Sequence, residues 1–517
     1  MVLTPGIWNS AKSGSFQDAT KWTANVVPSS LDDALLTPTG AAFTVTSSAN
    51  ATVNAFALSA NATLAIAGGT TFTATNGTLG SSSYTDYGAI NVGAGSTLNI
   101  GNAFTESGGR LYSAGTTNIA NATLTLTNQA VITTQGGVVN LTGDTISLGP
   151  NSQLRAGIGT GANAGGALNI TGGSVTGGAV FARYAGVPGG SDVVNLTDAT
   201  LRGVYFDSTN GGVINVLGST LIDGSSHTVA NTAQIEVQDG ANLTLSGVIN
   251  NANYYSYSGI FLDAVTGSAT NTELLIQGAV TLDGSTGGGT LGLSNSLSNV
   301  IDGAISGGAL DNVNNTISGA GFIGVGDGSL TLKNSGVISA LDANGLFIDT
   351  SSFGVAGTVD NTGGILEAFG VGGLHLSANT NVLGGAAEIF AGSSLELQQS
   401  KNLSVTFEDT GPSASLTLDT STDQSFYNGG GGGSTIAFDA GSGVNDLVNL
   451  AGLAYSSISG AMSESYTVSG GIGLLSVSNG RGAVNLDIVD QGYSLANFSL
   501  SKFTAAGHTG TTVTFSS

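Results

Sequence analysis

Three tyrosines form the densest candidate binding site in this sequence. Tyr254, Tyr255 and Tyr257 lie close together in a chain in which only 6% of residues are aromatic. A tyrosine ring has an apolar face and a polar hydroxyl, so a group of exposed tyrosines can stack on sugar rings or pack against a neighbouring subunit. The alternative is a tyrosine stack inside the fold, and the sequence alone does not choose between these roles.

Charged residues that could catalyse a reaction are scarce. A polysaccharide lyase or hydrolase needs paired carboxylates, or acidic Ca²⁺ ligands together with an Arg or Lys base. Asp207 beside Arg202, and the pair Arg155 and Arg183, are the few places to look. The chain has 10 Lys and Arg against 33 Asp and Glu, so binding of an anionic polymer is electrostatically poor. We therefore expect no enzyme activity, with a polysaccharide lyase or hydrolase as the alternative.

Several other chemistries lack the residues that they require. The 3 histidines are far apart in the sequence and cysteine is absent, which excludes a cysteine nucleophile and leaves no clustered zinc ligands. The glycine-rich stretches contain no phosphate-binding loop motif. A net charge of -23 opposes binding to nucleic acid and to anionic lipid, and no apolar run is long enough for a membrane span. We expect neither nucleic-acid binding nor membrane insertion.

One short pattern, apolar-Asn-apolar, recurs along the first half of the chain. Its central residues are 19, 22, 29, 26 and 20 positions apart, and a last copy with Glu in the middle follows after 21 more. A loose period near twenty is typical of the coils of a solenoid. The central residues are Asn99, Asn118, Asn140, Asn169, Asn195, Asn215 and Glu236.

Each triplet alternates in the manner of a half-buried β-strand, and one such strand cannot bury its apolar face alone. If each interval is one turn, the triplets stack in parallel register and their apolar pairs form a continuous inner column. The sequence therefore predicts an all-β parallel β-helix. The asparagines form a row outside the coil, or an amide ladder inside it, and both arrangements stay open.

The two ends of the sequence differ from its middle. Residues 1–40 contain Trp8, Phe16 and Trp22, which are bulky enough to cover the open end of a β-helix, although the tryptophans could instead form a platform for a ligand. We expect a cap at 1–40, the β-helix at 41–427 and a small β module at 428–517. A glycine run, 429–433, marks the last boundary as a hinge.

A second repeat pattern in residues 301–400 places Asn-X-Gly corners before apolar pairs, as at Asn334-Ser335-Gly336 and Asn361-Thr362-Gly363. It resembles the rungs of large proteobacterial surface proteins, the β-strand-repeat adhesins and autotransporter-like passengers. The opening block of Trp8, Trp22 and Pro28 is similar to the N-terminal cap of the same proteins. The resemblance implies a right-handed β-helix displayed outside the cell, and the low charge is similar to that of surface-layer proteins.

The C-terminal region resembles type I secreted proteins. Residues 436–450 look like one decayed copy of their Gly-Asp Ca²⁺ repeat, which implies Asp439 and Asp446 as Ca²⁺ ligands. The hydroxyl-rich tail 507–517 is similar to an uncleaved export signal, with a final edge strand as the alternative. We expect a secreted protein associated with the cell surface.

These features predict a structural protein that assembles with itself into a surface layer, a fibre or a biofilm matrix. Tiling of polar faces would join the copies, with Ca²⁺ as a bridge between acidic patches. The first alternative is an adhesin that binds cell-surface glycans through Tyr254, Tyr255 and Tyr257. The second is the lyase or hydrolase described above.

Overall fold

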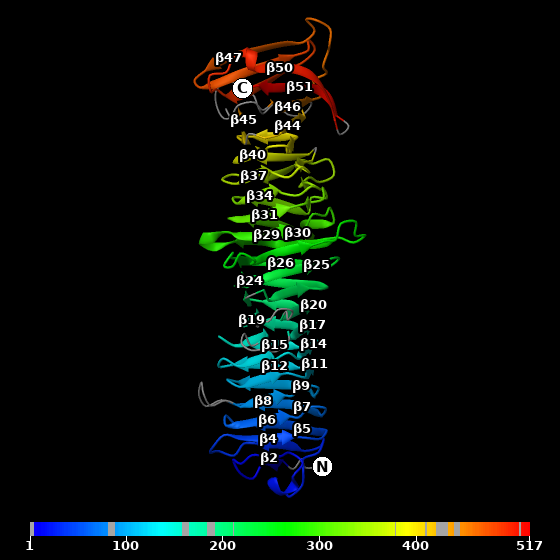
Figure 1. Cartoon of the computed structure of the whole chain (residues 1–517), viewed down its shortest axis with the longest axis vertical. Helices are drawn as coiled ribbons and strands as arrows, with labels where there is room; N and C mark the ends of the chain where they lie inside the picture. Colours follow the sequence, from blue (N-terminus) through cyan, green and yellow to red (C-terminus); the bar gives the residue numbers. More distant parts are fainter. Residues whose placement is uncertain are drawn as a thin grey trace. The chain divides into compact units, whose positions relative to one another are not determined.

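The computed structural model forms two compact units, Met1–Ile260 (unit 1) and Phe261–Ser517 (unit 2). Both are built from short parallel strands, and together they hold about 16 solenoid turns among the described residues (Figure 1). No helix in this described part of the chain is long and apolar enough to cross a membrane. The structure describes residues 5–80, 88–157, 165–183, 192–209, 211–377, 379–408, 411–419, 433–438, 445–505 and 508–516.

A turn of unit 1 is made of three short strands, each paired in parallel with the corresponding strand of the next turn. Alternation explains the strands, because Val139 and Leu141 point into the core while Asn140 between them points outward. The predicted parallel β-helix is therefore confirmed. In two successive turns the pairs are β14 (Val138–Thr142) with β17 (Ala167–Thr171), β15 (Thr145–Leu148) with β18 (Ser174–Thr176), and β16 (Gln153–Ala156) with β19 (Ala179–Arg183).

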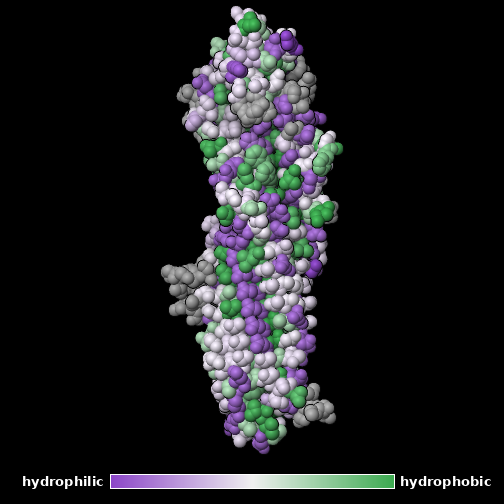
Figure 2. Space-filling model, turned by 90° about the vertical axis from the view of Figure 1, so that its right-hand side faces the viewer, coloured by the Kyte–Doolittle hydropathy of each residue, from purple (hydrophilic) through white to green (hydrophobic). Residues whose placement is uncertain are grey.

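The apolar-Asn-apolar triplets stack in register, as the sequence predicts. Each central asparagine pairs with the next, and Asn215 pairs with Glu236. Figure 1 has these strands on its right-hand side, which faces the viewer in Figure 2, and a hydrophilic stripe follows this face of unit 1. The remaining strands of the row are β9 (Thr97–Ser107), β11 (Thr116–Ala120), β20 (Val193–Thr197), β23 (Val213–Val216) and β25 (Gln234–Gln238).

The sequence left open whether these asparagines lie outside the coil or form an amide ladder inside it. They are half-exposed on the outside, and each amide donates from Nδ2 to Oδ1 of its predecessor over 2.8–3.0 Å. The row ends where Asn99 donates to Thr73 and where Gln238 donates to Asn215. We call Asn99, Asn118, Asn140, Asn169, Asn195 and Asn215 the outer asparagine row. It is outside the coil and an amide ladder at the same time.

Aromatic rings close the N-terminal end of unit 1. Trp22 is buried, meets Trp8 and Phe16 edge to face at 5.0 Å, and donates from its indole to the Phe16 carbonyl. Phe16 in turn packs on Phe72 of β7 (Thr71–Leu79) at 5.4 Å. Because both indoles are buried, they are not available as a platform for a ligand.

Unit 2 repeats the turn of three parallel strands. Three successive turns carry its candidate site. They consist of β33 (Leu330–Asn334), β34 (Val337–Ala340) and β35 (Leu346–Ile348), then β36 (Gly357–Asp360), β37 (Ile365–Ala368) and β38 (Leu374–Leu376), then β39 (Thr380–Leu383), β40 (Ala386–Phe390) and β41 (Ser394–Leu397).

The Asn-X-Gly corners of unit 2 form a second amide ladder, inside the fold. Asn312 donates to Asn334, and Asn334 donates to Asn361, both over 2.8 Å. All three side chains are fully buried. A Cβ at Gly336 would approach the Asn315 carbonyl oxygen to 2.3 Å, and one at Gly364 would meet Asn334 at 2.5 Å. Gly336, the last residue of one Asn-X-Gly corner, and Gly364, the residue after the other corner, thus make room for the chain of the turn before. We call Asn312, Asn334 and Asn361 the buried asparagine row.

The parallel stack of unit 2 ends in a small antiparallel module, as expected from the fold prediction. The strand β46 (Asn445–Ala451) pairs in parallel with β44 (Ser415–Asp419) and antiparallel with β51 (His508–Ser516). A meander of β47 (Ser463–Ser469), β48 (Ile472–Ser478) and β49 (Ala483–Val489) follows β46 in the sequence. The glycine run predicted as a hinge lies outside the described residues, apart from Gly433.

Candidate functional site

Three rings and a carboxylate form a row on successive turns of unit 2. Phe322 lies in β32 (Gly321–Ile323) and pairs in register with Phe347 in β35, which pairs with His375 in β38. Glu396 in β41 follows His375. All four are half-exposed, because each is the middle residue of a triplet whose outer members are buried. We call Phe322, Phe347, His375 and Glu396 the ring row.

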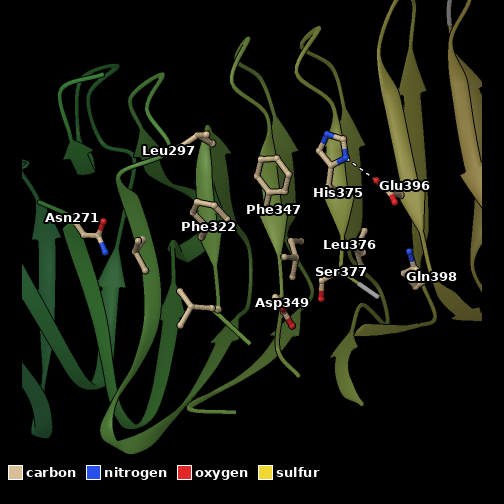
Figure 3. A pocket seen from close by; sticks show the side chains of 14 residues that line it. Asn271, Leu297, Phe322, Phe347, Asp349, His375, Leu376, Ser377, Glu396 and Gln398 are labelled. Carbon is tan, nitrogen blue, oxygen red and sulfur yellow. Dashed lines mark hydrogen bonds and ion pairs between the residues drawn. The ribbon is translucent and has the colours of Figure 1, made fainter. Parts of the chain in front are cut away.

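The rings stack face to face along the row. The centroids of Phe322 and Phe347 are 5.3 Å apart with planes at 26°, and those of Phe347 and His375 are 4.7 Å apart at 13°. These separations follow the ~4.8 Å spacing of neighbouring strands, so the ring edges face outward. Figure 3 shows the rings on adjacent strands, with His375 turned toward Glu396.

Hydrogen bonds fix the histidine at the end of the stack. Its Nδ1 is 3.1 Å from the Glu396 carboxylate, and its Nε2 is 2.8 Å from the Gly372 carbonyl oxygen. Both partners are acceptors, so both ring nitrogens donate when the imidazole is protonated. The bond to Glu396 raises the pKa of His375 against the opposing effect of burial, and the Gly372 carbonyl adds to the rise. The arrangement favours a cationic imidazolium stacked on Phe347.

A cavity of about 510 Å³ lies over the ring row. Leu297, Val300 and Val325 form an apolar part of its wall, Asp349, Ser377 and Gln398 form a polar part, and Asn271 lies at the other end (Figure 3). Its volume is within the usual range for small-ligand pockets. We call this cavity the groove of unit 2.

The polar wall of the groove carries negative charge. Burial acts to raise the pKa of Asp349, but hydrogen bonds from Ser351 and Ser377 outweigh it, and the net pKa is lowered. The ionised form of Asp349 is therefore favoured, and Glu396 is a second carboxyl group in the lining. Gln398 keeps a covered side-chain oxygen without a hydrogen-bond partner. Apolar walls, ring edges and a few planar polar groups suit a neutral polyhydroxylated ligand such as a saccharide.

The structure brings the predicted tyrosines together. They lie in the segment after β26 (Asn242–Asn251), where Tyr254 and Tyr255 meet edge to face at 4.7 Å and Tyr255 stacks on Tyr257 at 5.2 Å. Tyr254 is 72% exposed, while the other two are half-buried. The cluster therefore lies at the surface of unit 1 and is not a stack inside the coil.

The predicted pairing of Asp207 with Arg202 is wrong. Arg202 pairs with Asp223, Nε to Oδ2 at 3.4 Å, because these two residues lie opposite each other in neighbouring strands. Asp207 instead accepts from the Thr232 hydroxyl at 3.3 Å. The other pair, Arg155 and Arg183, does come together: both guanidinium groups lie over the ring of Phe181.

The structure adds no support for the two predicted calcium ligands. Asp439 lies outside the described residues. Asp446 lies in β46, is only 6% exposed, and accepts from the Ala414 amide at 3.3 Å. No group of three or more His, Cys, Asp or Glu that could hold a metal ion occurs among the residues that the structure describes.

Sequence reasoning missed the ring row, although a signal was present. Residues 346–348, 374–376 and 395–397 read Leu-Phe-Ile, Leu-His-Leu and Leu-Glu-Leu, which is the same apolar-X-apolar pattern that identified the outer asparagine row. Their central residues are all different, so no identical residue repeats and the pattern is easily overlooked.

Comparison with known proteins finds one informative similarity. No family model matches the chain. The chain is similar to Outer membrane protein A of Rickettsia rickettsii. The two sequences are 28% identical over 343 residues, which cover 58% of this chain and 14% of the rickettsial protein. The chain thus matches only a small part of that much longer relative.

Proposed function

We propose that this chain is a bacterial cell-surface β-solenoid that acts as an adhesin and binds glycans through the groove of unit 2. The observation that carries the proposal is the groove itself, where a stack of rings, two carboxylates and side-chain amides converge on a cavity of about 510 Å³. The similarity to an outer membrane protein supports the surface location. The negative charge of the polar wall favours neutral or basic sugars over acidic ones.

The test measures saturable binding of the whole purified chain to an array of neutral, basic and acidic glycans. We expect Phe347→Ala to weaken binding about tenfold, since the ring lies at the centre of the row, and His375→Ala to act in the same direction. Phe369→Ala is the matched control, because this half-exposed phenylalanine of unit 2 packs on Phe390 and does not line the groove. Binding that survives both groove variants, or falls equally with the control, would overturn the proposal.

Self-assembly is the second candidate function. Exposed apolar side chains in unit 2, among them Phe353, Val355 and Val371, favour contacts between copies of the chain. A lattice or fibre would be visible by negative-stain microscopy after dialysis into millimolar Ca²⁺. A chain that stays monomeric with and without Ca²⁺ would count against assembly and against calcium as a bridge.

A further inference from the structure

Two arginines of unit 1 share one aromatic ring. Arg155 in β16 pairs in register with Phe181 in β19, which pairs with Asp207 in β22 (Tyr205–Thr209). Arg183 follows Phe181 by two residues and so leaves β19 on the same side. The Cζ atoms of Arg155 and Arg183 lie 5.3 Å and 5.0 Å from the centroid of Phe181. Both guanidinium groups thus gather around a single buried phenylalanine.

Within the described part of the chain, these guanidinium groups have no carboxylate in direct contact. Neither forms an ion pair with a carboxylate among the described residues. The Nε atoms of both arginines are covered and have no hydrogen-bond acceptor in the part of the chain that the structure describes. Burying a charged group without a partner is costly, and two like charges beside one ring add their mutual repulsion. A bound oxyanion would relieve both costs, because the guanidinium fork matches a carboxylate in a bidentate geometry.

The electrostatics of the arginine pair depend on burial and on the charges around it. Burial, and after it the positive charges of Arg183 and Arg110, lower the pKa of Arg155 to about 10. Asp207 is a nearby carboxyl group: burial raises its pKa, while the hydrogen bond from Thr232 and the positive charge of Arg183 act in the opposite direction. The net charge of -23 is spread over the whole chain, whereas screening limits its reach to about 8 Å at physiological salt. The positive charges of Arg155, Arg183 and Arg110 lie near one another at this place, beside the carboxyl group of Asp207.

Tyrosines border the arginines on the same face. Tyr205 meets Phe181 edge to face at 6.0 Å, is 38% exposed, and its hydroxyl is 3.0 Å from the Thr232 hydroxyl. Burial raises the pKa of Tyr255, and the nearby charge of Asp207 and the neighbouring tyrosines, Tyr205 included, add to the rise. The tyrosine cluster and the arginine pair, which the sequence suggested separately, therefore belong to one surface.

We propose that this surface binds a saccharide of the uronic acid class, with its carboxylate on Arg155 and Arg183 and its sugar rings on the tyrosines. A free phosphate or sulfate would use the arginines but leave the tyrosines without a role. A nucleic acid would bring many phosphates against a strongly acidic chain, which opposes it. This site lies in unit 1 and is independent of the groove of unit 2.

Calorimetric titration of the whole chain tests the proposal with two trisaccharides. One is trigalacturonate, and the other is its carboxyl-reduced form, which keeps the rings and loses the charges. We expect trigalacturonate to bind at least about tenfold more tightly, and Arg183→Gln to remove about tenfold of that affinity. Arg202→Gln is the matched control, since it removes the same charge from an arginine of unit 1 that is already paired with Asp223. Arg183→Lys retains the charge without the fork and should fall between wild type and Arg183→Gln.

Several results would overturn this assignment. Absence of trigalacturonate binding would do so, as would equal affinity for the reduced trisaccharide. An equal loss in Arg202→Gln would point to bulk charge, and sulfate that binds as tightly as trigalacturonate would point to a simple anion site. Unchanged thermal unfolding shows that the variants fold. Phe347→Ala, which tests the groove of unit 2, should leave trigalacturonate binding unchanged, so the two proposals fail separately.

Discussion

The outer asparagine row of unit 1 and the buried asparagine row of unit 2 use the same side chain and nearly the same hydrogen bonds. Both link Nδ2 of one turn to Oδ1 of another over 2.8–3.0 Å. The outer amides are half-exposed and bond mainly to one another. The buried amides also form hydrogen bonds with the main chain. The Asn312 side chain donates to the Asn315 carbonyl at 2.9 Å and accepts from the Asn315 backbone amide at 3.0 Å.

The same repeated residue, asparagine, therefore has a different structural role in each row. An outer amide that loses its neighbour can bond to water, whereas a buried amide holds a corner whose main-chain groups have no water to replace it. The ring row adds a third case, because stacked rings do not satisfy one another through hydrogen bonds. Its polar members, His375 and Glu396, bond to each other at the edge of a cavity.

The largest effect should come from breaking the buried row at its centre. Asn334→Leu removes the bonds to Asn312 and Asn361 and leaves their buried polar atoms without partners, at a cost of about 3 kcal/mol in the free energy of unfolding of unit 2. Hydrogen exchange of the amides in β33 and β36 measures the loss. The control is Lys333→Leu, at an exposed neighbour whose ion pair with Asp311 contributes below about 0.5 kcal/mol. Equal losses in the two variants would remove the role assigned to burial.

A smaller loss is expected from the same change in the outer row. Asn140→Leu removes the bonds to Asn118 and Asn169, but water can replace them at this half-exposed position, so we expect about 1 kcal/mol. Hydrogen exchange in β14 and β17 gives the value, with Thr142→Val at the exposed end of β14 as the control. A loss as large as that of Asn334→Leu would mean that the ladder itself, and not its burial, stabilises the fold.

The smallest effect concerns the ring row, which responds to pH where the amide rows do not. The pKa of His375 is raised above 6.5 by Glu396, so its contribution to stability is complete below about pH 6.5 and is lost as pH rises through the raised pKa. Because the pair is half-exposed, we expect below about 1 kcal/mol. Urea unfolding of unit 2 at about pH 5.5 and about pH 8.5 measures it, and Glu396→Gln should abolish the difference. The cost of Asn140→Leu should be the same at both pH values.

The sequence predicts the stacking of the outer asparagine row because the row repeats one residue between apolar neighbours, and burial of those neighbours fixes the register. It does not predict that the amides lie outside, since an alternating strand allows either face to be inward. The Asn-X-Gly motif was correctly interpreted as a corner. The close approach of the preceding turn at Gly336, and at Gly364 one residue after the second motif, is revealed only by the coordinates.

The candidate sites were harder to predict because they depend on register across unequal turns. Phe322, Phe347, His375 and Glu396 are 25, 28 and 21 positions apart, so one missed insertion misaligns all of them. Register across unequal turns also made the pairing of Arg155 and Arg183 in unit 1 hard to predict. Cations are rare in the sequence, which argued against an anionic ligand, but the fold brings Arg155 and Arg183 to one ring. The division of the chain after Ile260 likewise has no counterpart in composition.

The strand β46 has consequences for how copies of this chain can join. One of its edges is occupied by β44 and the other by β51, which runs in the opposite direction. Templated elongation, in which an incoming chain adds strands to an open sheet edge as in amyloid, has no starting point at β46. A filament contact made at β46 itself must therefore rely on side chains and not on shared backbone hydrogen bonds.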